Sequence, residues 1–202
     1  MDNKAMFKIG YGLYVLTASD NGKDNGCIIN TAMQVTSTPN RISVTVNKQN
    51  YTHDIIAATG TFNVSVLSQE ANFEMFKRFG FQSGRDVDKF ANYGFCKKAP
   101  NGIYYISNQT NAYISGKVEQ SIDLGTHTMF IAAVTDAQVL SDVPTVTYDF
   151  YQKEIKPKPA AQEKKGGYRC KICGYVYEGD VLPEDFVCPI CKHGAADFEK
   201  IV

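Results

Sequence analysis

The chain lacks the features that several classes of binding protein require. Its 202 residues carry no net charge, because 21 Lys and Arg side chains balance 21 Asp and Glu side chains. A protein that binds nucleic acid needs an excess of basic residues to neutralise phosphates, so the sequence argues against nucleic acid as the main partner. Only three histidines are present, which disfavours a histidine-rich metal site.

Long apolar segments are also missing. No stretch approaches the ~18 consecutive apolar residues that a membrane-spanning helix needs. The first ten residues, MDNKAMFKIG, contain no apolar core of a secretory signal. We therefore expect a cytoplasmic protein with no membrane partner.

Signature motifs of common enzymes are absent as well. The sequence has no G-x-S-x-G hydrolase motif, no H-E-x-x-H zinc motif and no phosphate-binding P-loop. The pair Gly10 and Gly12 lacks the third glycine of a dinucleotide fingerprint and does not join a strand to a helix. Neither conventional hydrolysis nor Rossmann-type nucleotide binding is indicated.

A break in composition divides the chain. Residues 152–167 contain two prolines, a lysine-rich end and a glycine pair, but one large apolar residue. This composition is typical of a linker, stiffened in part by Pro157 and Pro159. The sequence therefore predicts a domain at residues 1–151, a linker at 152–167 and a small domain at 168–202.

The first domain shows the alternating pattern of half-buried strands. Residues 41–47 (RISVTVN) and 61–67 (TFNVSVL) alternate apolar and polar side chains with a period of two. Further β-prone segments lie at 12–19, 27–38, 112–120 and 129–140. Many strands and few helices predict a mainly β fold, with a β-barrel rather than repeated βαβ units.

Two short helices are expected among these strands. The first covers residues 52–58, follows a cap region at Asn50 and stops at Gly60. The second covers residues 70–79 and carries phenylalanine at every third position near its end. That aromatic stripe favours packing into the core over a cofactor-binding role.

Four of the six cysteines form two C-x2-C pairs near the end of the chain. They are Cys170, Cys173, Cys188 and Cys191. In a reducing compartment such pairs are typical metal ligands, and four thiolates in a tetrahedron suit zinc or iron. Cys27 and Cys96 stand alone and are expected to be small buried side chains.

Two interpretations of the metal stay open at this point. Fourteen residues separate Cys173 from Cys188, which is close to the spacing of a structural zinc ribbon. The aromatic content of the segment favours iron instead, because an apolar shell tunes a redox potential and is unnecessary for a structural zinc. The aromatic residues concerned are Tyr168, Tyr175, Tyr177, Phe186 and Phe198.

The cysteines belong to a longer pattern. It reads Y-x-C-x-x-C-G-Y-x-Y, then D-F-V-C-P-x-C, then D-F, within residues 168–202. This pattern resembles rubredoxin, and the resemblance implies a one-electron iron carrier with all four cysteines as ligands. The segment departs from the family in a shorter loop between the cysteine pairs, in Phe186 for a tryptophan and in Lys192 for a glycine. We expect the shorter loop to expose the iron and Lys192 to make the second turn less relaxed.

A polar run lies between β-like segments of the first domain. Residues 30–39 read N-T-A-M-Q-V-T-S-T-P, and residues 47–53 add amides, a lysine and a tyrosine. Such groups, with a helix N-terminus, can hold a phosphate and the polar edge of a ring. Taken alone, the run favours an ordinary polar sheet face, because Thr and Ser are common in exposed strands.

The order of motifs around this run carries a second resemblance. G-L-Y-V-L-T-A at 12–18 precedes the polar run, and T-G-T-F-N-V-S-V-L at 59–67 and L-G-T-H-T-M-F-I at 124–131 follow it. In this order the motifs resemble the flavin reductase family, over residues 5–151. The resemblance implies a split β-barrel that binds FMN, usually as a homodimer with the flavin near the subunit interface.

The same resemblance implies which residues bind the flavin. Asn30, Thr31, Ala32 and Gln34 would lie near the edge of the ring system, and Thr36, Ser37 and Thr38 would also line it. Asn47, Lys48, Tyr51 and Thr52 would surround the phosphate, and Phe79, Gly80 and Phe81 would cover the flavin. His127, in the G-T-H motif, would face the flavin or the incoming nicotinamide as the catalytic candidate. A strand histidine with satisfied hydrogen bonds is an equal interpretation of His127.

The two modules together resemble the high-molecular-weight rubredoxins. We expect electrons to pass from NAD(P)H to FMN, then to one iron ion, and then to an external acceptor. The resemblance implies a flavodiiron protein, which reduces nitric oxide or dioxygen, as that acceptor. Two alternatives stay open: a flavin-binding barrel with a structural zinc ribbon, and a reductase from which free flavin departs.

Overall fold

The chain divides into two compact units. The computed structural model describes residues 2–157 and 167–201, and the units are Met1–Lys156 and Pro157–Val202. Most of the predicted linker lies outside the described residues. No helix in the described ranges is long and apolar enough to cross a membrane.

One antiparallel sheet of seven strands forms the body of the first unit, in the order β2-β1-β5-β8-β9-β4-β3. The strands are β1 (Tyr14–Asp20), β2 (Lys23–Ile29), β3 (Met33–Ser37), β4 (Asn40–Asn47), β5 (Thr61–Leu67), β8 (Thr110–Asp123) and β9 (His127–Val139). A separate hairpin joins β6 (Cys96–Lys98) to β7 (Tyr104–Ile106). The mainly β fold predicted from the alternating segments is confirmed.

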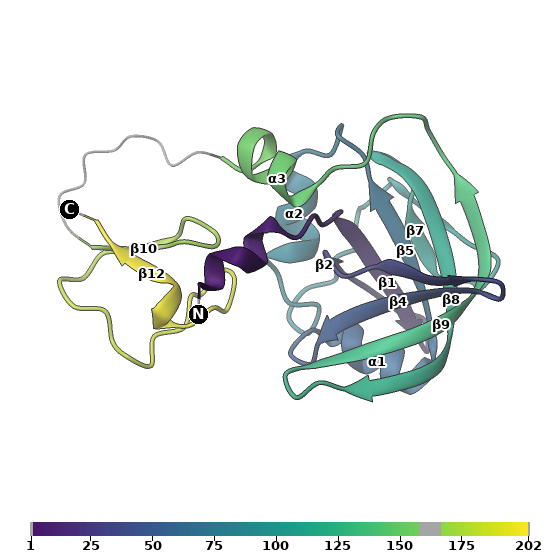
Figure 1. Cartoon of the computed structure of the whole chain (residues 1–202), viewed down its shortest axis with the longest axis horizontal. Helices are drawn as coiled ribbons and strands as arrows, with labels where there is room; N and C mark the ends of the chain where they lie inside the picture. The colour runs from purple at the N-terminus through teal and green to yellow at the C-terminus, as the bar shows by residue number, and fades with distance from the viewer. Residues whose placement is uncertain (1, 158–166, 202) are drawn as a thin grey trace. The chain divides into compact units, whose positions relative to one another are not determined.

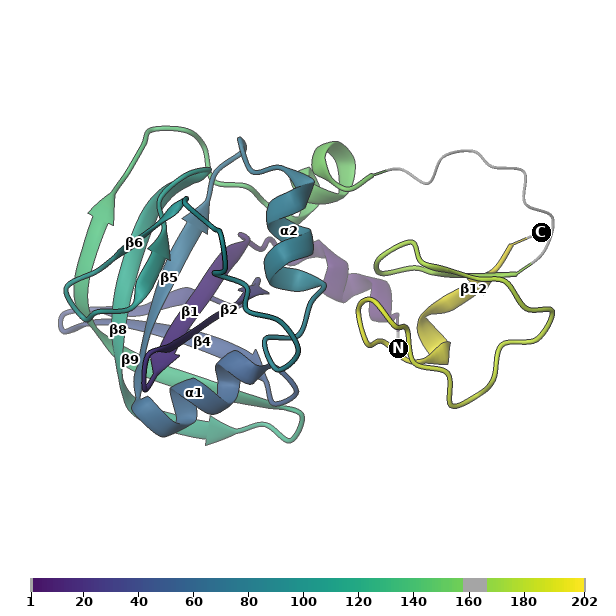
Figure 2. The same ribbon diagram turned by 180° about the vertical axis from the view of Figure 1, so that it is seen from behind.

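Two irregularities in β8 bend this sheet. The register with β9 shifts between Ser115 and Gly116 and again between Val118 and Gln120. Bulges of this kind raise the local twist and let a long hairpin curve. Figures 1 and 2 show the resulting curled sheet, with α1 and α2 packed against it.

The helices of this unit are short. They are η1 (Asn3–Lys8), α1 (Tyr51–Thr59), α2 (Phe73–Gly80), α3 (Tyr148–Phe150) and the π-helical turn η2 (Tyr151–Ile155). Helix α1 stops at Gly60, whose left-handed φ of 68° places its amide on the carbonyl of Ile56. Helix α2 begins later than predicted, because the side chain of Asn72 caps it by accepting from the amide of Met75.

Strand β1 supplies side chains to two cores. Leu16 and Ala18 face the interior of the curled sheet, where helix α1 adds Ile55 and Ile56. The intervening side chains of the strand pack against the other layer, which contains α2. Phe76 and Phe79 lie there, so the prediction that the aromatic stripe packs in the core is confirmed for both.

The second unit is a small three-stranded sheet with two cysteine turns. Its strands are β10 (Tyr168–Cys170), β11 (Val176–Tyr177) and β12 (Phe198–Lys200), in the order β11-β10-β12, and η3 (Ala195–Asp197) precedes the last strand. The fully buried part of its core consists of Cys170, Cys188 and Phe198. A core this small makes the unit dependent on a further stabilising interaction.

Candidate metal centre and flavin site

The structure gathers the four C-terminal cysteines into one cluster. Their sulfur atoms all lie within 4.8 Å of one another, and Cys170 Sγ to Cys191 Sγ and Cys173 Sγ to Cys188 Sγ are both 3.5 Å. Metal–sulfur bonds of about 2.3 Å in a tetrahedron place the sulfurs about 3.8 Å apart. The donor set and its spacing therefore fit one tetrahedral metal ion.

Both cysteine turns have the same backbone pattern. The amide of Gly174 donates to the carbonyl of Cys170, and the amide of Lys192 donates in the same way to the carbonyl of Cys188, both at 2.9 Å. This turn needs a left-handed residue after the second cysteine, and φ is 80° at Gly174 and 61° at Lys192. A lysine with left-handed backbone agrees with the expectation that Lys192 makes the second turn less relaxed, which stays a prediction.

Backbone amides also point at the sulfur atoms. Burial raises the pKa of Cys173 to about 11, against the opposing effect of the Tyr175 amide. Burial acts in the same direction on Cys188, but the amides of Cys191 and Ile190, together with hydrogen bonds from the Cys173 and Cys191 side chains, lower the pKa of that thiol. N–H groups directed at sulfur stabilise the thiolate form, which is the form that binds metal.

An aromatic group surrounds one side of the cluster. Phe186 lies at its centre, with ring centroids 4.8 Å from Tyr177, 5.4 Å from Phe198 and 6.4 Å from Tyr175. Cys170 and Cys188 are buried, whereas Cys173 and Cys191 are half-buried. One pair of sulfurs is thus shielded, and the other pair lies toward the surface.

Replacing Lys192 with glycine should stabilise the second unit by about 0.5 to 1 kcal/mol, because glycine adopts a left-handed φ without the clash of a Cβ atom. The denaturant midpoint for loss of the metal–thiolate absorbance measures this. Gly174→Ala is the opposite control, since a Cβ there meets no neighbour but φ is 80°. Gly174→Ala should lower the midpoint, and a lower midpoint for Lys192→Gly would contradict the account of the turn.

The predicted ring-edge residues lie along the edge strand β3 and the segment before it. All five residues of β3 are exposed, and β3 pairs only with β4 among the described strands. Gln34 Nε2 donates to Asn40 Oδ1 at 2.9 Å, and Thr36 Oγ1 donates to the carbonyl of Pro39 at 2.6 Å. Ser37, the last residue of β3, and Thr38, in the turn that follows, are exposed.

The three residues before β3 are less accessible. Asn30, Thr31 and Ala32 are half-buried, and Ala32 packs against the interior core. The hydroxyl of Thr31 donates to the carbonyl of Thr45 at 2.6 Å, which ties this segment to β4.

The predicted phosphate residues meet the end of the β8–β9 hairpin. Asn47 pairs with His127 in the β4–β9 ladder, although the two lie far apart in sequence. The amide of Lys48 donates to the carbonyl of Thr126 at 3.0 Å, and its Nζ contacts Asp123 Oδ1 at 2.7 Å. The sheet thus places the candidate histidine beside the candidate phosphate lysine.

The N-terminus of α1 lies at the same place. Asn50 precedes the helix without a side-chain capping bond among the described contacts, which leaves first-turn amides for an anion. His53 hydrogen-bonds with Thr128 Oγ1 through Nε2 at 2.9 Å and with Asp54 through Nδ1 at 3.1 Å. His127 Nδ1 lies 2.9 Å from Thr126 Oγ1.

Two predicted residues point inward. Thr52 is fully buried, and its hydroxyl accepts from Asn25 Nδ2 at 2.9 Å. Phe79 is 1% exposed and packs between Phe90 and Tyr93, at centroid distances of 5.6 and 5.5 Å. Neither side chain presents an open face in this structure.

The sequence did not identify two cations that flank Tyr51. Lys23 Nζ lies 4.6 Å and the Arg85 guanidinium 5.2 Å from the centroid of the Tyr51 ring. Arg85 also pairs with Asp54 at 2.6 Å. Both cations line a hollow of about 560 Å³ between the β1–β2 turn and residues 84–88. No local motif signals these contacts, because they form between segments distant in sequence.

This architecture is that of a modular redox protein, with a curled β-barrel and a four-thiolate module on one chain. The family described as flavin reductase like domain matches residues 6–157, and the rubrerythrin, rubredoxin-like domain matches residues 168–199. The chain therefore belongs to the flavin reductase-like family, and it carries a C-terminal rubredoxin-like domain.

Individual relatives agree with this assignment. The high molecular weight rubredoxin of Moorella thermoacetica is 39% identical, and the similarity covers all of both chains. The ferric-chelate reductase (NAD(P)H) of Archaeoglobus fulgidus is 40% identical over 78% of this chain and 93% of its own. The NADH:FAD oxidoreductase of Streptomyces globisporus superimposes with a TM-score of 0.66 at 21% identity, covering 79% of this chain and 92% of that one, and so supports the fold alone.

Proposed function

We propose that the protein is an electron-transfer oxidoreductase that takes electrons from NAD(P)H through FMN to one iron ion and delivers them to an external protein. The observation that carries this proposal is the four-sulfur cluster with its aromatic shell on the same chain as a flavin reductase barrel. Bound flavin supplies the exchange between a two-electron hydride donor and a one-electron iron acceptor.

On the metal side, the chain's own groups favour iron with a useful redox potential. Amides directed at Cys173 and Cys188 stabilise thiolate charge, and the rings around Phe186 limit water on one side. The half-buried pair Cys173 and Cys191 leaves the other side accessible for electron exit.

For the flavin, we propose that Lys48, Asn47 and the first-turn amides of α1 bind the phosphate of FMN. Thr52 would contribute through its amide, because its hydroxyl is engaged with Asn25. The polar groups of Asn30, Thr31, Gln34 and the β3–β4 turn would face the ring system, with Phe79 supporting the covering loop from beneath. His127 would orient the nicotinamide, and the likeness to an NAD(P)H-dependent ferric-chelate reductase supports that donor.

The exposed strand β3 supports a homodimer. An edge strand presents unpaired backbone groups, and here it also exposes Met33 and Val35. Ile122 and Leu124 are exposed at the nearby end of the hairpin. We propose that a second copy covers these residues, that the protein is cytoplasmic and that a flavodiiron protein is the acceptor.

Visible absorbance of the full-length protein, before and after anaerobic addition of NADH, tests the proposal. Flavin and ferric–thiolate bands should both be present, and both should bleach. Bleaching of the flavin alone would contradict transfer to the metal. A colourless metal site that contains zinc by elemental analysis would instead favour the structural-ribbon alternative, which the spacing of Cys173 and Cys188 leaves open.

A further inference from the structure

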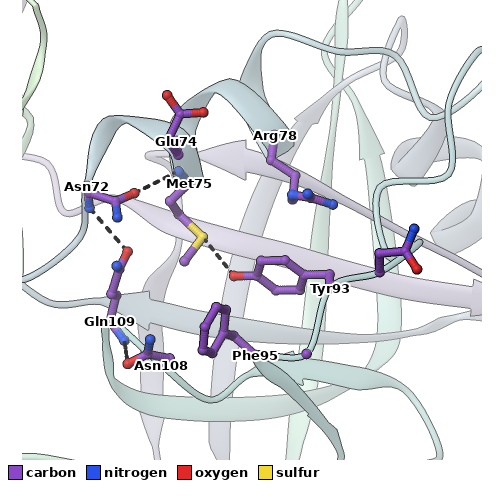
Figure 3. A pocket seen from close by; sticks show the side chains of 10 residues that line it. Asn72, Glu74, Met75, Arg78, Tyr93, Phe95, Asn108 and Gln109 are labelled. Atoms are coloured by element: carbon purple, nitrogen blue, oxygen red, sulfur yellow. Dashed lines mark hydrogen bonds between the residues drawn. The ribbon is translucent and has the colours of Figure 1, made fainter.

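A second hollow lies at the start of α2, and none of its lining residues is assigned above to flavin or metal. It has a volume of about 230 Å³ and is formed by the start of α2, residues 92–95 and residues 108–109. Figure 3 shows its side chains, among which amides and aromatic rings predominate. Met75 and Tyr93 belong to the core around α2, and Asn72 caps that helix. Asn108, Gln109 and Phe95 are not part of that core, and the proposed electron path does not use them.

Three carboxamides of this hollow are fixed in orientation by the backbone. Asn72 Oδ1 accepts from the amide of Met75 at 3.2 Å, Gln109 Oε1 accepts from the amide of Asn72 at 3.2 Å, and Asn108 Oδ1 accepts from the amide of Gln109 at 3.0 Å. A backbone N–H can only donate, so each carboxamide must turn its oxygen toward it. The three NH2 groups have no recorded partner among the described residues and remain as donors.

A cation is held on the opposite side of the hollow from these donors, beside Tyr93 (Figure 3). Arg78 Nη1 donates to the carbonyl of Lys89 at 3.0 Å, and the guanidinium lies 4.9 Å from the centroid of the Tyr93 ring. The acidic side chain of the hollow, Glu74, pairs with Lys77 at 2.8 Å. Because Glu74 is paired, the net charge that the hollow presents to a ligand is the positive charge of Arg78.

Aromatic side chains form the remaining wall. Tyr93 and Phe95 are in edge-to-face contact at a centroid distance of 5.8 Å, and Phe95 is 56% exposed. A phenylalanine left this exposed beside a hollow offers a face to an apolar ring or chain.

The backbone at this site is also unusual. Asn92 and Gln109 have φ values of 54° and 61°, and both line the hollow. Left-handed backbone is costly for a glutamine, and such outliers concentrate at ligand sites. The left-handed backbone of Gln109 occurs together with two hydrogen bonds. Its side-chain Oε1 accepts from the amide of Asn72, and its own amide donates to Asn108 Oδ1.

We propose that this hollow binds a small carboxylate with a flat apolar body. The carboxylate would accept from NH2 groups of Asn72, Asn108 and Gln109, and the body would lie against Tyr93 and Phe95, with Arg78 contributing positive charge from the opposite side of the hollow. The donors exclude a cation, and the aromatic wall favours an organic acid over an inorganic anion. None of the residues that line the hollow is assigned to flavin or metal, and Tyr93 contacts Phe79 from the hollow's side.

Titration of the ¹⁵N-labelled full-length protein with benzoate tests this proposal. Side-chain NH2 signals of Asn72, Asn108 and Gln109 should shift together, with a dissociation constant on the order of 1 mM for so shallow a site. Benzyl alcohol, which keeps the ring and lacks the charge, should shift them far less. No shift of these signals at about 20 mM benzoate, or equal shifts with the alcohol, would overturn the proposal.

Gln109→Glu tests the donor role without removing the structural bond. One carboxylate oxygen can still accept from the amide of Asn72, while the NH2 donor becomes a second negative oxygen. We expect benzoate affinity to fall at least about tenfold. Gln138→Glu, an exposed residue of β9 outside the hollow, makes the same change of charge and should leave affinity unchanged. Equal affinity in Gln109→Glu and wild type would refute the assigned donor.

Discussion

Replacing Cys188 with serine should reduce bound iron from one ion per chain to nearly none. The sulfur of Cys188 is completely buried, and the alcohol of serine does not ionise near neutral pH to replace a thiolate. Iron analysis and the ferric–thiolate absorbance of purified protein measure the loss. Cys96→Ser is the matched control, because Cys96 lies in the barrel unit outside the cluster and should leave iron content unchanged.

The same substitution should also unfold the second unit. Among its described residues, the buried core besides Cys188 consists of Cys170 and Phe198, and a domain of about 40 residues rarely holds together without metal or disulfide. Amide signals of residues 168–201 should therefore lose their dispersion. Those of the barrel should not, and NADH should still reduce bound flavin. Loss of barrel signals or of flavin reduction would show that the two units are not independent.

Sequence patterns within short segments predicted most of the fold. Period-two alternation located β4 and β5, but these strands are more than half-buried, because Ser43, Asn63 and Ser65 on their polar faces are buried as well. The C-x2-C pairs located the cluster because both turns are local. The glycine of the C-x-x-C-G pattern is Gly174, and its φ of 80° is the left-handed backbone that this turn adopts.

Contacts between segments that are distant in sequence could not be predicted from such local patterns. The pairing of Asn47 with His127 depends on the register of β4 against β9, which no local pattern fixes. The approach of Lys23 and Arg85 to Tyr51 depends on how a turn and a loop fold over α1. The inward rotation of Thr52 follows from its position on the buried face of α1, beside Asn25.

Lys48→Ala should weaken FMN binding by roughly 10- to 100-fold, because a charge-assisted hydrogen bond to phosphate contributes about 1.5 to 3 kcal/mol. The backbone bond from Lys48 to Thr126 is kept, so the barrel should remain folded. Fluorescence titration of deflavinated protein with FMN gives the dissociation constant. Lys97→Ala, at an exposed position in β6, should bind FMN as the wild type does.

A substitution at Asp123 distinguishes a phosphate-binding role for Lys48 from a purely structural role. The hydrogen bond from Lys48 holds the pKa of the Asp123 carboxyl below its usual range, so the ion pair persists until acid well below neutral pH. Because the pair is exposed, water screens it and the lysine can exchange this partner for a phosphate. If Lys48 serves phosphate, Asp123→Asn should leave FMN affinity equal or higher. If Lys48 only anchors the hairpin, Asp123→Asn should weaken FMN binding as much as Lys48→Ala does, and the phosphate assignment would be withdrawn.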